Sequence, residues 1–259
     1  MPSYYCGCAA CVEARTDTRA ARSCACLLVS ATDTSAPLPT QTRHTLIDAG
    51  PELRTQLVRA EASAIDRLLV THEHFDHIGG IPQLEFYVKL KSLVPLPVYA
   101  GSEASAAIRQ QFSFMLDTLD LRPLDLWQRL EFDGIAYTPL PAQHAPGTFG
   151  FLIESPKTRL AYFPDTGPLP QEALAALAVE PLDILVIDAT FNGRNWMPRS
   201  HHSISDAIAL AERLAPAKAY LTHLSMHYDE PITCVGLSEL LAPYGGAIEP
   251  AYDGLRVAL

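Results

Sequence analysis

The segment Thr71–His77 reads THEHFDH, and it constrains this chain more than any other part of the sequence. It directly follows an apolar run that predicts a β-strand. Imidazole nitrogens suit zinc, iron and manganese, and carboxylate oxygens suit harder cations. Because alternate residues of an extended turn share a side, His72 and His74 can face one ion while Asp76 and His77 reach a second. The alternative is a solvated polar loop, but 9 histidines spread over 259 residues rarely produce this spacing.

Length and composition predict one globular domain over residues 1–259. The chain is 48% apolar and 19% charged, which is a globular balance. No apolar run reaches the roughly 18 residues of a membrane helix, and the start of the chain lacks a secretory signal pattern. We therefore expect a soluble, cytoplasmic protein that contacts no membrane. A net charge of −10 argues against a nucleic-acid partner, which needs clustered Lys and Arg. It allows a small phosphorylated substrate, because bound metal ions can reverse the local charge.

Short apolar runs bounded by Gly, Pro, Asp or Asn predict a series of strands. These runs are 26–30, 45–47, 67–70, 94–99, 135–139, 150–154, 159–163, 184–187 and 219–221, with weaker candidates at 245–250 and 255–258. Pro95 and Pro97 favour an edge position for 94–99. Helices are expected at 51–60, 102–116, 171–178 and 203–214, and the last begins with a Ser203-x-x-Asp206 capping pattern. This order predicts an α/β fold of two packed sheets with helices outside.

Single polar residues at the ends of other predicted strands accompany the histidine segment. They are Asp48 before it, and His144, Asp165 and His223 after it. Alone, each of the three later residues would more often be a core or surface residue. In series with the histidine segment, they resemble the signature of the metallo-β-lactamase superfamily over roughly positions 24–230. The resemblance implies the four-layered αββα sandwich of that superfamily.

The resemblance also implies a role for each residue. The ligands of one metal ion would be His72, His74 and His144. The ligands of the other would be Asp76, His77 and His223, with Asp165 bridging both ions. Asp48 matches the family's early Asp, which lies behind the metal ligands rather than among them.

A second motif favours phosphoester chemistry. Two metal ions about 3.5–4 Å apart can hold a bridging hydroxide and clamp a phosphoryl oxygen. The stretch Arg199–Ser203 reads RSHHS and resembles the His-x-Ser/Thr motif of the phosphodiesterase branch, with His201 in the motif position. We assign catalytic roles to His201, as general acid or phosphate donor, and to Asp76. His202 would be a bystander. The alternative is a helix-capping loop with two solvated histidines.

Three more polar residues surround this motif. Asp188 ends a predicted strand and can orient a metal-bound histidine from behind, although a turn former at a strand end is an equal alternative. Arg194 and Arg199 bracket the loop before His201, and guanidinium groups suit phosphate. Either could bind a non-reacting substrate phosphate, and solvated loop arginines are the alternative.

Cysteines crowd the start of the chain, where Cys6, Cys8 and Cys11 form C-x-C-x-x-C on a predicted short loop. Three thiolates can hold a structural zinc, which then needs a fourth ligand. The triplet resembles that of the PhnP family, in which a late His completes the site. That family's position is Met226 here, so we expect His227 one residue on, with Cys24 or Cys26 as alternatives. Reactive or incidental thiols are the other interpretation. The family opens with a strand before its cysteines, so we expect this first edge strand to be absent.

The narrower resemblance implies a specific reaction. It is the opening of 5-phosphoribosyl 1,2-cyclic phosphate to ribose 1,5-bisphosphate in phosphonate catabolism, by a homodimer with manganese or zinc at the catalytic pair. The same ligands also serve RNA 3′-processing phosphodiesterases and thioester hydrolases. The former usually carry a basic, Gly-rich arm that this sequence lacks, and the latter lack the cysteine triplet. A non-catalytic metal-binding accessory protein of cofactor biosynthesis is the remaining alternative.

Overall fold

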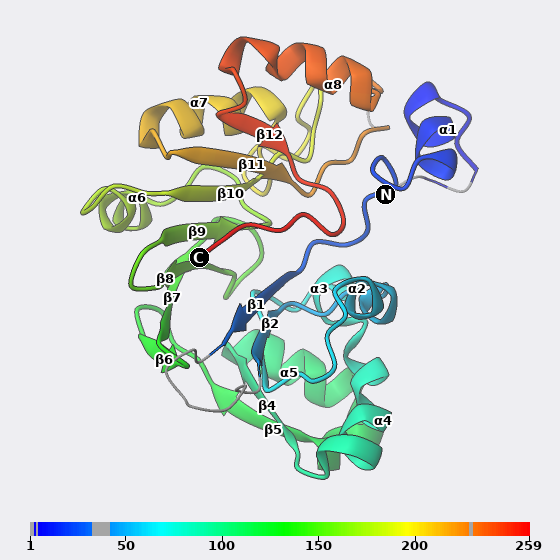
Figure 1. The fold of residues 1–259 in the computed structure, drawn as a ribbon, viewed down its shortest axis with the longest axis vertical. Coiled ribbons are helices and arrows are strands. Elements are labelled where there is room, and N and C mark those ends of the chain that lie inside the picture. Colours follow the sequence, from blue (N-terminus) through cyan, green and yellow to red (C-terminus); the bar gives the residue numbers. More distant parts are fainter. Residues whose placement is uncertain (1–2, 4, 33–41, 228–229) are drawn as a thin grey trace. The chain divides into compact units, whose positions relative to one another are not determined.

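The computed structural model describes residues 3, 5–32, 42–227 and 230–259 (Figure 1). The chain divides into two compact units. The first unit comprises 24–139 and 146–149, and the second comprises 1–23, 140–145 and 150–259. The prediction of a single domain over 1–259 stays a prediction. Among the described residues, no helix combines the length and apolar character needed to cross a membrane.

The first unit is built on a mostly parallel sheet in the order β1-β2-β3-β4-β5. Only β1 runs antiparallel, against β2. The strands are β1 (Leu27–Ala31), β2 (Arg43–Ile47), β3 (Arg67–Leu69), β4 (Leu96–Ala100) and β5 (Leu119–Pro123), followed by the hairpin of β6 (Leu130–Phe132) and β7 (Ile135–Pro141). The helices are α2 (Leu53–Arg59), α3 (Phe75–Ile78), η1 (Ile81–Leu84), α4 (Glu85–Tyr87), η2 (Val88–Ser92), α5 (Ser102–Gln111) and η3 (Ser113–Thr118).

The second unit has strands in the order β12-β11-β10-β9-β8, all parallel except β8. They are β8 (Phe149–Glu154), β9 (Arg159–Phe163), β10 (Ile184–Asp188), β11 (Lys218–Thr222) and β12 (Ile248–Pro250). The helices are α1 (Ala9–Thr16), α6 (Gln171–Leu177), α7 (Ile204–Leu214), α8 (Cys234–Leu241) and η4 (Ala242–Tyr244). In Figure 1, α7 and α8 lie along β10, β11 and β12.

Each unit has its own apolar core. In the first unit, strand residues such as Leu68 and Val98 pack against helical residues such as Ile108. In the second, Leu185 and Leu221 pack against the buried stripe of α7. Burying a side chain of this size contributes about 1.5–3 kcal/mol. The cores therefore hold the strands in register and fix the positions at which their polar ends emerge.

Most predicted elements are confirmed within a few residues, including the capping box in which Ser203 and Asp206 exchange both hydrogen bonds. The prediction of an edge strand at 94–99 is wrong, because β4 lies between β3 and β5. Pro95 precedes β4, and the pairing with β3 begins only at Val98, so neither proline removes a needed donor on that side. No strand forms at 255–258.

The cysteine triplet does not lie on a simple loop. Cys11 lies in the first turn of α1, and Cys8 is the N-cap of that helix. The sequence pattern missed this helix because its hydrophobic periodicity is weak. The helices from Phe75 to Ser92, the helix α8 and the strands β5 and β6 were also absent from the prediction.

Glycines fix the path of the histidine segment by allowing close backbone contact. Gly80 has an ordinary φ of −90°, so it is not required by a left-handed turn. Instead, a Cβ on Gly80 would lie 2.0 Å from the carbonyl oxygen of Gly50. The amide of Gly80 donates to Ala49 O at 2.7 Å, and the amide of Ala49 donates to His77 O at 2.7 Å. Contact between these backbones therefore joins the end of β2 to the histidine segment.

A Gly80→Ala substitution should lower the free energy of unfolding by about 1–3 kcal/mol, because the new methyl group meets backbone atoms that cannot move aside. Urea unfolding followed by circular dichroism measures the effect. Gly7→Ala is the control, because a Cβ there meets nothing within 4 Å. Equal unfolding midpoints for the two variants would contradict the close-contact argument.

Candidate metal centre

In the first unit, the predicted ligands gather at the carboxyl ends of neighbouring parallel strands. Asp48 follows β2, and the histidine segment follows β3. Carboxyl ends of parallel strands lie at one edge of a sheet, where ligands commonly bind. Asp48 has a left-handed φ of 65°, a conformation that Asp tolerates better than most residues. This backbone geometry directs its carboxylate toward the histidine segment.

The Asp48 carboxylate is the hydrogen-bonding centre of this half of the site. It is fully buried and accepts from the Thr71 amide at 2.8 Å, the Thr71 hydroxyl at 2.8 Å and His77 Nδ1 at 2.8 Å. Burial raises the pKa of the Asp48 carboxyl, and the neighbouring His77 and the Thr71 hydrogen bonds oppose that rise. Asp48 thus lies behind His77, where the resemblance predicts it.

The other side chains of the segment converge in front of Asp48. The ring of His72 lies 4.6 Å from that of His74 and 4.2 Å from that of His77, between centroids. His77 Nε2 is 3.4 Å from an Asp76 carboxylate oxygen. The four residues predicted as ligands in this segment therefore form one cluster.

The second unit gathers its predicted ligands in the same way. Asp165 follows β9, Asp188 ends β10 and His223 follows β11, all of which are parallel. One carboxylate oxygen of Asp165 lies 3.0 Å from His223 Nε2, and the other lies 3.9 Å from His144 Nε2. Asp165 therefore has one carboxylate oxygen near His223 and the other on the side of His144.

A hydrogen-bond network behind these residues centres on Asp188. One of its oxygens accepts from His201 Nδ1 at 2.7 Å, and the other accepts from the Thr190 hydroxyl at 2.6 Å. Thr190 Oγ1 in turn lies 2.8 Å from His223 Nδ1. Asp188 thus orients His201 directly and the predicted ligand His223 through a hydroxyl group, which favours an orienting role over that of a simple turn former.

The donor set fits divalent metal ions. His77 Nδ1 faces a carboxylate, His144 Nδ1 donates to the Ser200 carbonyl at 2.8 Å, and His72 Nδ1 lies 3.0 Å from the Thr71 hydroxyl. In a neutral imidazole, a protonated Nδ1 leaves Nε2 as the nitrogen with a lone pair. Second partners of this kind fix the tautomer and orientation of metal-binding histidines. Each unit therefore presents Nε2 atoms beside carboxylates, a set suited to zinc, manganese or iron.

The loop before α7 differs from the solvated alternative. His201 and His202 are only 8% and 5% exposed. Burial lowers the pKa of His202, and the nearby charges of Asp188 and Asp206 oppose that shift. His202 is therefore buried rather than solvated, and its expected role as a bystander stays a prediction, while Arg194 and Arg199 are exposed.

Sequence reasoning missed the hydroxyl groups of the site. Thr71 and Thr190 each bond to an Asp and lie within hydrogen-bond distance of a His Nδ1. Asn195, also missed, donates to His201 O at 2.8 Å. The only available signal was position, because each threonine lies within three residues of a strand end. Threonine is common there for many other reasons.

The cysteine triplet forms a separate cluster in the second unit. The sulfur atoms of Cys6, Cys8 and Cys11 all lie within 4.8 Å of one another. Tetrahedral zinc would hold thiolates about 3.8 Å apart, given bonds near 2.3 Å. The Ser3 amide lies 3.4 Å from Cys11 Sγ, and the Ser3 hydroxyl lies 3.2 Å from His227 Nε2. One residue thus links the triplet to the predicted fourth ligand.

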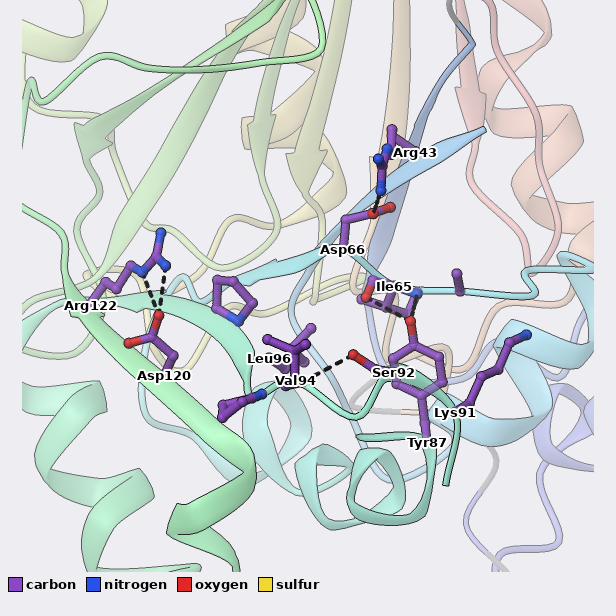
Figure 2. Close-up of a pocket in the computed structure, with 13 residues that line it drawn as sticks. Arg43, Ile65, Asp66, Tyr87, Lys91, Ser92, Val94, Leu96, Asp120 and Arg122 are labelled. Carbon is purple, nitrogen blue, oxygen red and sulfur yellow. Dashed lines mark hydrogen bonds and ion pairs between the residues drawn. The ribbon is translucent and has the colours of Figure 1, made fainter. Parts of the chain in front are cut away.

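A cleft of about 560 Å³ lies in the first unit, mainly at the amino ends of its parallel strands (Figure 2). Its residues come from the amino ends of β2 and β4, from β5, from the residues before β3, and from α4 and η2, whereas the histidine segment follows the carboxyl end of β3. Its charged groups largely pair with each other, Arg43 with Asp66 at 2.7 Å and Arg122 with Asp120 at 2.6 Å. None of the predicted ligands lines this cleft.

The sequence matches the family described as Beta-lactamase superfamily domain over residues 43–224. This range includes the histidine segment, His144, Asp165, Asp188, His201 and His223. The cysteine triplet lies outside it.

Solved structures with the same fold include two that cover this chain completely. A structure described as a new diphosphatase from the PhnP family has a TM-score of 0.81 and 24% identity, with 92% of that chain covered. Zinc-bound PqqB from Methylobacterium extorquens has a TM-score of 0.75 and 19% identity, with 95% of that chain covered. At these identities the likeness concerns the fold, and it confirms the predicted fold class.

Curated relatives carry different names. An octanoyltransferase of Porphyromonas gingivalis is 27% identical over 84% of this chain, which spans only 42% of that protein. Ribonuclease BN of Cronobacter sakazakii is 22% identical over 75% of this chain and 88% of its own length. Ribonuclease Z of a Bradyrhizobium species is 31% identical over 52% of this chain and 45% of its own length. The family match confirms the superfamily that the resemblance predicted, and the chain belongs to the beta-lactamase superfamily.

Proposed function

We propose that this chain is a metal-dependent phosphodiesterase that opens 5-phosphoribosyl 1,2-cyclic phosphate to ribose 1,5-bisphosphate. The observation that carries the proposal is the Asp188–His201 pair, 2.7 Å apart, in the same unit as the ligand set of His144, Asp165 and His223. A carboxylate-supported histidine beside a metal centre suits the departure of an alkoxide from phosphorus. The diphosphatase named among the similar structures supports phosphorus chemistry of this kind.

As the family resemblance implies, His72, His74 and His144 would hold one ion. Asp76, His77 and His223 would hold the other, with Asp165 as a ligand of both. The matched family range contains both sets. A pair of manganese or zinc ions would supply a nucleophile at neutral pH and neutralise charge on the phosphoryl oxygens.

Residues of the chain would donate the proton and bind the substrate. Asp188 accepts from His201 Nδ1 and so fixes the orientation of the ring, with Nε2 as the nitrogen that would donate a proton to the departing oxygen. Asp76 would take its catalytic role as a metal ligand. Arg194 and Arg199, exposed on the loop before His201, would bind a phosphate that does not react.

Cys6, Cys8, Cys11 and His227 would hold a structural zinc. The cluster of three sulfur atoms and the Ser3 link to His227 support this set. Cys24 is a weaker fourth ligand, because burial and the neighbouring Glu52 raise the pKa of its thiol and keep it protonated.

A second candidate function is RNA processing, which the ribonuclease BN and ribonuclease Z relatives favour. The net charge of −10 opposes it, because binding an RNA backbone depends on basic residues. A precursor tRNA with a 3′ extension distinguishes the two functions. Cleavage of that RNA, with no opening of the cyclic phosphate, would favour the ribonuclease.

His201→Ala should lower kcat for the ribosyl cyclic phosphate, and for bis(p-nitrophenyl) phosphate, by roughly 10²–10⁴-fold with manganese present. Metal content should not change, because His201 is not a proposed ligand. His44→Ala is the control, since His44 lies on β2 and bonds to Ser30. Absence of turnover in the wild type with metals bound would support a non-catalytic accessory protein instead.

Thr190→Val should weaken metal binding about 10–100-fold, because it removes the hydroxyl behind His223 while preserving side-chain shape. Competition with a chromogenic chelator measures the affinity. Thr118→Val is the matched control, because Thr118 is equally buried but bonds only to Met115 O among the contacts described. Identical affinities for both variants would remove the orienting role of Thr190.

Metal analysis should find about three ions per chain in the wild type, and about two in Cys11→Ser and His227→Ala. Cys234→Ser should retain the wild-type content, because Cys234 lies beside Arg22 rather than in the triplet. A His227→Ala variant that keeps its full metal content would exclude His227 as the fourth ligand and leave the triplet unaffected.

A further inference from the structure

The segment after β9 contains Asp165, Thr166 and Gly167 in succession, and the middle residue is not one of the proposed ligands. Thr166 is completely buried. A buried hydroxyl group needs hydrogen-bond partners, because leaving it unpaired is costly. The partners of Thr166 therefore show which parts of the second unit this segment is held against.

The hydroxyl group of Thr166 joins this segment to the one that carries His144. Thr166 Oγ1 accepts from the Gln143 amide at 3.2 Å and donates to Gly167 O at 2.8 Å. The Gly167 amide donates to Gln143 O at 2.7 Å. Two consecutive residues thus bind both the amide and the carbonyl group of Gln143. Because His144 follows Gln143 directly, these bonds fix the backbone from which the His144 ring extends.

Close packing at Gly167 reaches the same histidine by a second route. A Cβ on Gly167 would lie 2.5 Å from the carbonyl carbon and oxygen of Arg199, and 3.0 Å from the amide nitrogen of Ser200. Ser200 O accepts from His144 Nδ1 at 2.8 Å. The segment 165–167 therefore contacts both the residue that precedes His144 and the backbone that binds the His144 ring.

The amide of Thr166 has a different partner. It donates to Asp188 at 3.0 Å, on the carboxylate oxygen that also accepts from His201 Nδ1. Every residue except proline supplies a backbone amide, so this hydrogen bond survives a change of the Thr166 side chain. Replacing that side chain therefore separates the role of its hydroxyl group from the support of Asp188 and His201.

We propose that Thr166 is a positioning residue that holds Asp165 and His144, two proposed ligands of one metal ion, in a fixed relative position. His144 Nε2 lies 3.9 Å from an Asp165 carboxylate oxygen. Groups behind metal ligands commonly contribute roughly 10–100-fold to metal affinity, because they hold the ligands in their binding orientation. The inference rests on the proposed function, from which it takes the ligand set.

Thr166→Val tests the hydroxyl group, because valine has nearly the same shape as threonine. Competition with a chromogenic chelator, in the absence of substrate, should show roughly tenfold weaker binding of one zinc ion. Thr166→Ser should recover the wild-type affinity, because serine restores the hydroxyl group.

Turnover of bis(p-nitrophenyl) phosphate separates positioning from general disruption of the site. In Thr166→Val, the manganese concentration that gives half-maximal turnover should rise by a similar factor. At saturating manganese, kcat should stay close to the wild-type value, because the backbone amide still supports Asp188 and His201.

Thr118→Val is the matched control. The Thr118 hydroxyl group is also buried, and it donates to Met115 O in the first unit. This variant should leave the zinc affinity and the half-maximal manganese concentration unchanged. Circular dichroism checks that each variant is folded, and Thr166→Ala takes the place of a valine variant that does not fold. Failure of both Thr166 variants to fold would assign the hydroxyl group to stability and overturn the inference.

Wild-type zinc affinity in Thr166→Val would also overturn the inference, as would equal losses in Thr166→Val and either Thr166→Ser or Thr118→Val. A wild type that binds its metal ions but opens no cyclic phosphate counts against the proposed function alone, and the zinc affinities still decide the role of Thr166. A wild type that binds no metal ion at these ligands would overturn both.

Discussion

The hydrogen bond between a strand-end carboxylate and a histidine Nδ1 is the interaction on which the rest of this structure depends. Asp48 makes it to His77 in the first unit, and Asp188 makes it to His201 in the second. In both units a threonine hydroxyl joins the same carboxylate to a further histidine, His72 or His223. This contact decides which imidazole nitrogen faces outward, and so whether the ring can bind a metal or transfer a proton.

Such contacts require a rigid and partly strained framework. Asp48 and Asp188 are fully buried, where an uncompensated carboxylate would be costly. Hydrogen bonds from Thr71, Thr166 and Thr190 provide part of the compensation. Asp48 and His223 also adopt left-handed backbone conformations, with φ of 65° and 56°. Strain of this kind persists where surrounding structure over-determines it, and here the parallel strands and their cores do so.

The sequence predicts the candidate metal ligands better than the residues that hold those ligands in place. The spacing of His72, His74, Asp76 and His77 is unusual enough to be recognised alone, and the superfamily resemblance supplies the later residues in order. The threonine hydroxyls were not predictable, because their role depends on strands that neighbour each other only after folding. The interior position of β4 was missed for a related reason. The prolines belong to β4 alone, whereas the position of β4 in the sheet depends on whether another strand pairs beside it. That strand is β5, whose short sequence gives little indication of a strand.

The hydrogen bond between Ser3 and His227 connects two parts of the second unit that lie far apart in the sequence. His227 follows His223 by four residues, and Ser3 also contacts Cys11. Ser3 therefore contacts both Cys11 and His227. Ser3 thus ties the segment after β11 to the cysteine cluster, so a change at the Cys11 thiol would also alter the surroundings of His227, 224 residues away from Ser3 in the chain.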